Sequence, residues 1–142
     1  MRKQCRRVVR RATPPMLINR GLHDDELQMM EIQLVEAFAG GWANKEHFDS
    51  LADMRNVMCL AAAHKDDQQA IDMANAMSIP LQNIRLRYAQ TDRFGVTGDE
   101  LRLMREFVEF YRDFWLRQPV ALYESAVASL EVALVNVRKE KP

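Results

Sequence analysis

The sequence predicts an all-α fold, an irregular bundle of four to six helices, from three observations. Apolar residues recur three and four positions apart in successive segments, which is the spacing of one buried face on an α-helix. Residues that cap helices precede these segments, and glycine or proline separates them. No segment alternates polar and apolar residues for long enough to predict a strand. The 142 residues fit a single helical domain over 21–142, preceded by a basic N-terminal arm over 1–20.

The first helix is predicted between a pair of acidic residues and a pair of glycines. Asp24 and Asp25 are expected N-caps, and their negative charge favours a helix start. Gly40-Gly41 ends the helix, because glycine readily adopts the left-handed conformation there. The apolar stripe of this helix consists of Leu27, Met30, Leu34 and Phe38.

The second helix is predicted to begin after Asn44, a favourable N-cap residue. We expect Asp53 and Arg55 to lie to the side of its buried stripe. That stripe consists of Phe48, Leu51, Met54, Met58 and either Ala61 or Ala62. The polar residues 64–67 (His-Lys-Asp-Asp) interrupt the apolar pattern and supply the cap for another helix.

The third helical segment leaves two alternatives open at Pro80. Its stripe before the proline is Ala70, Ile71, Ala74 and Met77, and beyond it Leu81, Ile84 and Tyr88. Proline either kinks a long helix or occupies the first turn of a new one. The segment is therefore one kinked helix or two short helices.

The last two helices follow the turn-like residues 91–98 (TDRFGVTG). Thr97 and Glu100 have the spacing of a capping box, in which side chains and backbone amides satisfy one another. The fourth helix has Phe107 and Phe114 beside a stripe of Leu101, Met104, Val108, Tyr111 and Trp115. After Gln118-Pro119, the stripe of the fifth helix is Val120, Tyr123, Val127, Leu130 and Leu134.

The formal net charge of zero combines two unlike parts. Residues 1–20 contain seven basic residues and no acidic one, so the rest of the chain has a net charge of −7. We expect the arm to be disordered, and arms of this kind bind nucleic acid or an acidic protein surface. A solubilising tail, or a tail that lies across the acidic body of its own protein, are the alternatives. The candidate contacts to nucleic acid or another anion are Arg6, Arg7, Arg10, Arg11, Arg85, Arg87 and Arg93.

The sequence predicts no enzyme, catalytic residue, cofactor or metal site. His23, His47 and His64 do not match a metal-binding motif, and His47 is expected on the surface of a first helical turn. The chain has neither a nucleophile elbow nor a phosphate-binding loop, and Cys59 lies in an apolar run where a thiol is usually inert. Two cysteines, no signal-peptide core and no apolar run long enough for a bilayer favour a cytoplasmic location.

Side chains typical of binding surfaces occur in three places. Arginine and aromatic residues dominate interface hot spots, and they gather at Arg85, Arg87, Tyr88, Arg93 and Phe94. Alternatively, these aromatic residues belong to the core and the arginines pair with acids. The nine methionines form either an adaptable surface or ordinary core, and exposure of Met54 or Met73 would favour the surface. The aromatic fourth helix suggests a homodimer. The candidate partner interface is Tyr88, Phe94, Phe110, Phe114 and Trp115.

Residues 85–126 (RLRYAQTDRFGVTGDELRLMREFVEFYRDFWLRQPVALYESA) resemble small uncharacterised all-helical proteins of proteobacterial phages and prophages. The shared features are the arginine–tyrosine pair, the loop RFGVTGDE, the segment YRDFWLRQP, and a basic arm followed by PPMLI. The resemblance implies a phage accessory or regulatory gene. Its motifs carry no known chemistry, so it implies no catalytic residue.

These observations together predict a non-enzymatic phage-type protein that binds a macromolecular partner. We expect it to regulate or inhibit a host system, as an anti-defence protein does, by binding a host or phage protein. Its acidic body would then occupy a groove that otherwise holds nucleic acid. The alternative is a transcriptional regulator that binds nucleic acid through the basic arm. A helix-turn-helix is not favoured, because the predicted second helix is acidic at its start.

Overall fold

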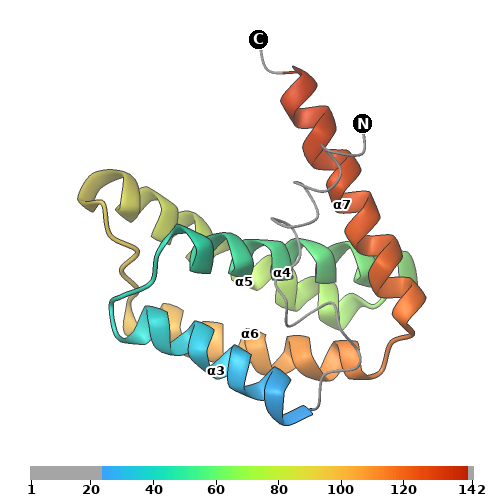
Figure 1. Ribbon diagram of the computed structural model, residues 1–142, viewed down its shortest axis with the longest axis horizontal. Helices are drawn as coiled ribbons and strands as arrows, with labels where there is room; N and C mark the ends of the chain where they lie inside the picture. Colours follow the sequence, from blue (N-terminus) through green and yellow to red (C-terminus); the bar gives the residue numbers. More distant parts are fainter. Residues whose placement is uncertain (1–23, 141–142) are drawn as a thin grey trace.

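The computed structural model describes the backbone of residues 24–140 and the side chains of Met29 and residues 31–133. Over this range the chain forms five α-helices and no strand, so the predicted all-α fold is confirmed (Figure 1). The predicted arm over 1–20, with Arg6, Arg7, Arg10 and Arg11, lies outside the described residues. The helices are α3 (Asp24–Ala39), α4 (Lys45–Lys65), α5 (Gln68–Thr91), α6 (Gly98–Leu116) and α7 (Val120–Glu140).

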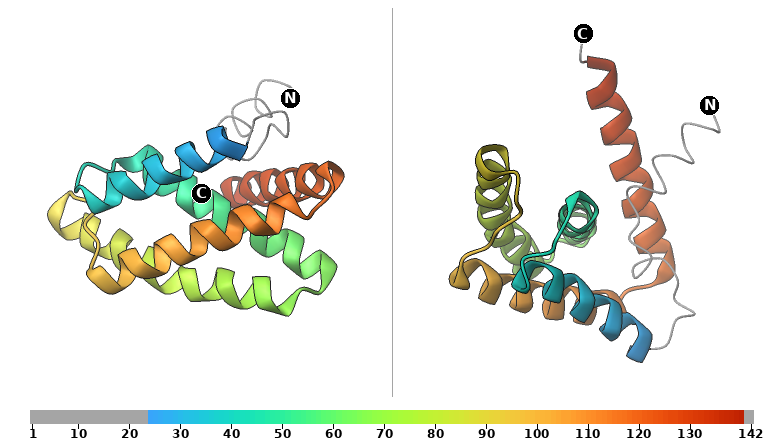
Figure 2. Two further views of the ribbon diagram at one scale, coloured as in Figure 1. Left: turned by 90° about the horizontal axis from the view of Figure 1, so that it is seen from below. Right: turned by 60° about the vertical axis from the view of Figure 1, so that its left-hand side comes forward.

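The helices form two layers and a projecting fifth helix. Helices α3 and α6 lie side by side in one layer, and α4 and α5 pack together in the other (Figures 1 and 2). Helix α7 packs against α4 and crosses the bundle steeply, so that its C-terminal half extends beyond the other helices (Figure 2). None of the helices, over the described residues, is long and apolar enough to cross a membrane.

Local sequence signals set the start of α4 and the junction between α4 and α5 where they were predicted. Asn44 accepts a hydrogen bond from the backbone N–H of His47 (3.1 Å), and the Asn44 N–H donates to His47 Nδ1 (3.0 Å), which forms a complete capping box at α4. Asp66 ends α4 in the left-handed conformation, and the Asp67 side chain caps α5 by accepting from Ala70 N–H (3.2 Å). Helix α3 begins at Asp24 itself, so its acidic pair lies in the first turn instead of preceding it.

Helix α5 runs without interruption through Pro80, which decides between the two alternatives in favour of one long helix. Proline cannot donate the backbone hydrogen bond of its position, so packing must offset this loss. Pro80 is buried, and its neighbours on the inner face of α5 are Met77, Leu81 and Ile84. Apolar burial on both sides of the proline therefore stabilises the continuous helix.

The core consists of the predicted stripes, with methionine as a large contributor. Met54 and Met58 on α4, Met77 on α5 and Met104 on α6 are fully buried, while Met73 is half-buried. Buried methionines fill irregular spaces between helices. The core interpretation of these residues is therefore favoured over an adaptable surface.

Two expectations about individual side chains are wrong. Asp53 is 6% exposed and does not lie to the side of α4, because α5 and α7 cover two faces of this helix. Val120 is 40% exposed, because it is the first residue of α7 and no helical turn precedes it to pack with. The side chains of Leu27, Met30 and Leu134 lie outside the described residues.

Candidate functional site

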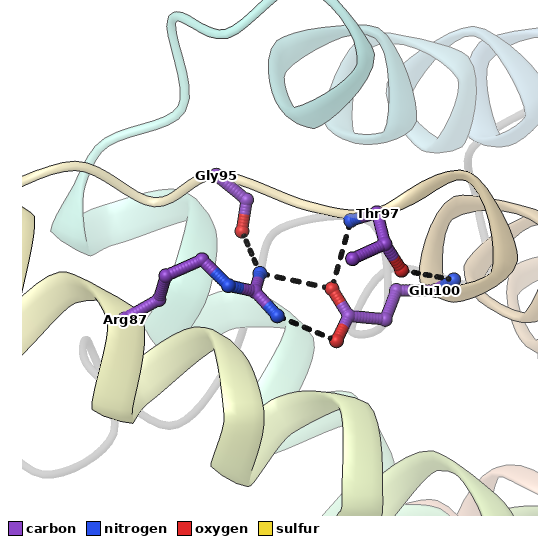
Figure 3. Close-up of polar contacts among 4 residues, drawn as sticks. All are labelled: Arg87, Gly95, Thr97 and Glu100. Atoms are coloured by element: carbon purple, nitrogen blue, oxygen red, sulfur yellow. Dashed lines mark hydrogen bonds and ion pairs between the residues drawn. The ribbon is translucent and has the colours of Figure 1, made fainter.

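The predicted arginine and aromatic cluster lies where α5, the loop 92–97 and α6 meet. Arg87 donates two hydrogen bonds to the Glu100 carboxylate, from Nη1 to Oε1 (3.0 Å) and from Nη2 to Oε2 (2.8 Å), and a third to the Gly95 carbonyl (Figure 3). Glu100 in turn accepts the Thr97 N–H (2.9 Å), while Thr97 Oγ1 accepts the Glu100 N–H (3.1 Å). We refer to Arg87, Gly95, Thr97 and Glu100 as the loop clamp.

The loop clamp explains the protonation state of its carboxylate. Glu100 is mostly buried, yet the hydrogen bonds from Arg87 hold its pKa below the ordinary value and outweigh the opposing effect of burial. The hydrogen bonds to Glu100 likewise raise the pKa of Arg87. An Arg–carboxylate pair with two parallel hydrogen bonds is geometrically specific, so it fixes the loop between α5 and α6.

Some residues predicted to contact an anion or a partner belong instead to the loop clamp or to the core. Arg87 is occupied by Glu100, and Phe94 is buried between Tyr88 (ring centroids 4.0 Å apart, nearly parallel) and Phe48 (5.4 Å). The core alternative is therefore favoured for Arg87 and Phe94. Arg85 and Arg93 are exposed, and Tyr88 is half-buried.

The aromatic residues predicted at a homodimer interface lie mostly inside the bundle. Phe114 is fully buried, and Trp115 packs edge-on against both Phe114 (5.0 Å) and Tyr123 of α7 (5.1 Å). Phe110 is half-buried. Tyr123 near the start of α7 thus covers part of Trp115, and the fully buried Phe114 offers no surface to a partner.

A groove of about 370 Å³ runs between α3 and α6, which lie side by side in Figure 2. Its apolar floor combines the buried residues Val35 and Val108 with Ile32, whose surface is 47% exposed. Charged side chains surround this floor. They are Glu31 and Glu36 from α3, and Arg105, Glu109 and Arg112 from α6. We refer to these eight residues as the α3–α6 groove.

Glu31 is the least exposed charged group in the α3–α6 groove. Its side chain is 8% exposed, and Oε1 lies 3.7 Å from Arg112 Nε. Burial raises the pKa of Glu31 to about 7; the positive charge of Arg112 opposes this shift and the negative charge of Asp113 adds to it. Our sequence reasoning missed Glu31, although its position between Leu27 and Leu34 places it on the apolar stripe of α3. A carboxylate at a stripe position was the available signal.

The raised pKa of Glu31 predicts a specific dependence of stability on pH. The folded chain holds this proton more tightly than the unfolded chain, whose glutamate titrates near 4.5. The contribution is therefore fully present below about pH 4.5 and is lost as the pH rises to about 7. We expect a loss on the order of 2 kcal/mol, discounted because the groove opens to solvent. Glu31→Gln removes this titration, so urea unfolding from pH 4.5 to 8 should show a flatter profile.

The exposed residue Glu36 supplies the matched control for this measurement. Glu36→Gln removes the same charge from the same helix and should leave the loss of stability between pH 4.5 and 7 in place. Equal flattening by both substitutions would show that general charge on α3, and not burial of Glu31, causes the pH dependence.

A second group of buried ionisable side chains lies among α4, α6 and α7. Burial raises the pKa of the Tyr111 and Tyr123 hydroxyls, and the negative charge of Asp53 adds to the shift in both. Glu131 on α7 also has a raised pKa because it is partly buried. The sequence did not indicate this group, because its members come from three helices far apart in the chain.

The remaining residues considered for chemistry have structural positions. His47 Nδ1 accepts the Asn44 N–H and its ring packs edge-on against Trp42, so the expected first-turn position is confirmed. Cys59 is free and half-buried on α4. Among the described residues, no three histidine, cysteine or acidic side chains are grouped to hold a metal ion.

Comparison with known proteins finds no match. No protein-family model, curated protein or solved structure matches this chain. The resemblance to phage and prophage proteins therefore stays a prediction, and the α3–α6 groove is assigned from its geometry and charge.

Proposed function

We propose that this chain is a non-enzymatic helical protein of phage or prophage type that regulates or inhibits a host system in the bacterial cytoplasm. It acts by binding a partner protein in the α3–α6 groove. The partner contributes a segment in which basic residues flank apolar ones. The observation that carries this proposal is the pairing of a half-exposed apolar floor with a helix that has five acidic residues and no basic one.

The apolar floor supplies the reason for binding at this place. Ile32 retains 47% of its surface while its groove neighbours Val35 and Val108 are buried, so a ligand that covers Ile32 extends an existing apolar cluster. Burial of apolar surface contributes about 25 cal/mol per Å². Aliphatic side chains of the partner are therefore expected on the floor.

The charges around the floor supply the preference for a basic partner. The groove has three carboxylates and two guanidinium groups: Glu36, Glu109 and Arg105 are exposed, whereas Arg112 lies near Glu31 (3.7 Å) and Asp113 (3.9 Å). Residues 24–140 contain 20 acidic and 12 basic residues, so the surrounding field also attracts cations. Complementary charge of this kind sets specificity and association rate more than affinity. A basic surface that otherwise binds nucleic acid fits this description.

A photo-cross-linking amino acid in place of Ile32 tests the proposal. In a lysate of the native cells, we expect this position to capture a protein with a basic segment. The same group in place of Ile79, which is 63% exposed on the outer face of α5, is the control and should not capture that protein. The captured protein is then purified and its affinity for the full chain measured at several salt concentrations.

The effects of glutamate substitution and of salt on the affinity test whether the groove binds the captured protein. Glu36→Gln with Glu109→Gln should weaken binding by roughly tenfold at low salt, and salt should weaken wild-type binding in the same direction. Capture at position 79 alone, or an affinity that neither salt nor these substitutions change, would contradict the proposed groove. Nucleic-acid binding is not proposed as a second function. Among the described residues, the observation that favours it is the exposure of Arg85 and Arg93.

A further inference from the structure

We infer that the α3–α6 groove binds residues 6–11 of the same chain until a partner displaces them. These residues read Arg-Arg-Val-Val-Arg-Arg and belong to the segment outside the described residues. The regulatory consequence, competition between arm and partner, rests on the proposed function. The contact between arm and groove is tested separately from it.

Residues 6–11 and the α3–α6 groove have complementary chemistry. The segment places Val8 and Val9 between two arginine pairs. The groove places an apolar floor between carboxylates, with Glu36 on the α3 side and Glu109 on the α6 side. Valine side chains on Ile32 would therefore leave arginines beside carboxylates at both ends. No other six-residue stretch of the sequence has two apolar residues between two arginine pairs.

Residues 1–20 and the nearby helix α3 carry opposite charges. Residues 1–20 carry seven basic and no acidic residues, whereas α3 carries five acidic and no basic residues. Arg105 and Arg112 also line the groove: Arg105 is exposed, whereas Arg112 lies 3.7 Å from Glu31 and 3.9 Å from Asp113. Three carboxylates therefore line the groove with two guanidinium groups, and the exposed Glu36 and Glu109 are the carboxylates that the arm would meet.

The chain between residues 6–11 and α3 is also long enough for these residues to reach the groove. Twelve residues lie between Arg11 and Asp24, and the thirteen residue-to-residue steps span at most about 43 Å at 3.3 Å each. Residues 31–36 lie about 10–18 Å along α3 from Asp24 at 1.5 Å per residue. The arm is therefore long enough to turn back over its own groove. Its local concentration there is on the order of millimolar, typical of a short tether.

These magnitudes predict a weak contact that can be displaced. Exposed ion pairs are individually weak and are screened by salt. The tether compensates for this weakness, so the arm occupies the groove in the absence of a partner. A partner with micromolar affinity competes effectively with such a contact.

The native residue Cys5 allows a direct test in the full chain. Cys59→Ala leaves Cys5 as the single cysteine, to which a nitroxide spin label is attached. We expect paramagnetic broadening of the backbone amides of residues 31–36 and 105–112, with intensities reduced by roughly twofold or more relative to other helices. About 0.5 M salt should restore these intensities, because the Debye length falls to a few ångströms.

Matched substitutions decide whether charge in the groove directs the arm. Glu36→Gln with Glu109→Gln should abolish the local broadening, and so should replacement of Arg6, Arg7, Arg10 and Arg11 by glutamine. Glu46→Gln with Glu124→Gln removes the same charge from exposed positions on α4 and α7 and should leave it unchanged. Cys59→Ser replaces Cys59→Ala if the latter alters the amide spectrum.

Three outcomes would overturn the inference. They are broadening centred on another helix, broadening that is equal in both glutamine pairs, and broadening seen only between separately labelled molecules in a mixed sample. Each leaves the partner captured at position 32 as an independent result. Conversely, local broadening with no captured partner supports arm docking and contradicts the proposed function.

Discussion

Replacing Phe114 with alanine is expected to lower the free energy of unfolding by about 3–5 kcal/mol. Phe114 is fully buried on α6 and packs edge-on against Trp115. Loss of the ring removes its burial and leaves a cavity that helices can close only in part. Urea unfolding followed by helical circular dichroism measures the change, with helical content before unfolding as the check that the fold is retained.

Phe110→Ala is the matched control on the same helix. Phe110 is half-buried at the edge of the core, so removal of its ring should cost only about 1 kcal/mol. Similar costs for the two substitutions would mean that Phe114 is not enclosed by the bundle. A Phe114→Ala protein of unchanged stability would place this residue back on a surface available to a partner.

Phe114 also shows which part of the fold the sequence could predict. Spacing along α6 identified a wide apolar face, and the capping residues Asn44 and Thr97 located helix starts, because these signals act within one or two turns. The covering of Trp115 depends on Tyr123 of α7, which packs back across the turn at 117–119, and Trp115 in turn packs on Phe114. Spacing within one helix cannot reveal which helix covers its face, so the aromatic excess suggested a dimer instead.

The α3–α6 groove could not be predicted from the sequence either, because spacing within one helix does not show which helix lies beside it. Its two sides are about 70 residues apart in the chain, and they meet only because α3 and α6 share a layer. Glu31 was the one local clue, a carboxylate on an apolar stripe. Pairing of the arginines with acids was predicted only as an alternative, and the partner of Arg87 was not named, because its pairing with Glu100 depends on how the loop 92–97 folds back onto α5.

Glu31 and Glu100 are expected to act on stability in opposite directions. Burial raises the pKa of Glu31, so its contribution is lost as the pH rises from about 4.5 to 7. Hydrogen bonds from Arg87 lower the pKa of Glu100, so its contribution is present above the unfolded value near 4.5 and is lost as the pH falls below it. The difference arises because Glu100 has two hydrogen bonds from an arginine, whereas Glu31 has a guanidinium nitrogen at 3.7 Å.

Removal of the Glu100 carboxylate is the second large effect that we expect. Glu100→Ala should lower the free energy of unfolding by about 2–4 kcal/mol, because it leaves Arg87 without its carboxylate partner and also removes half of the α6 capping box. Urea unfolding of Glu100→Ala, Arg87→Ala and the double variant measures the coupling between them. Glu100→Gln should keep the cap, lose the ion pair and flatten the acidic limb of the stability profile.

Asp99→Ala is the control that separates the loop clamp from ordinary surface charge. Asp99 precedes Glu100 in the first turn of α6 and pairs with Arg102 at 2.9 Å, but both of these side chains are largely exposed. Exposed pairs three residues apart contribute a few tenths of a kcal/mol, so this substitution should cost less than about 1 kcal/mol. If Asp99→Ala and Glu100→Ala prove equally costly, the bidentate geometry adds nothing to an N-terminal negative charge. If only Glu100→Ala is costly and couples to Arg87, the clamp fixes the loop that joins α5 to α6.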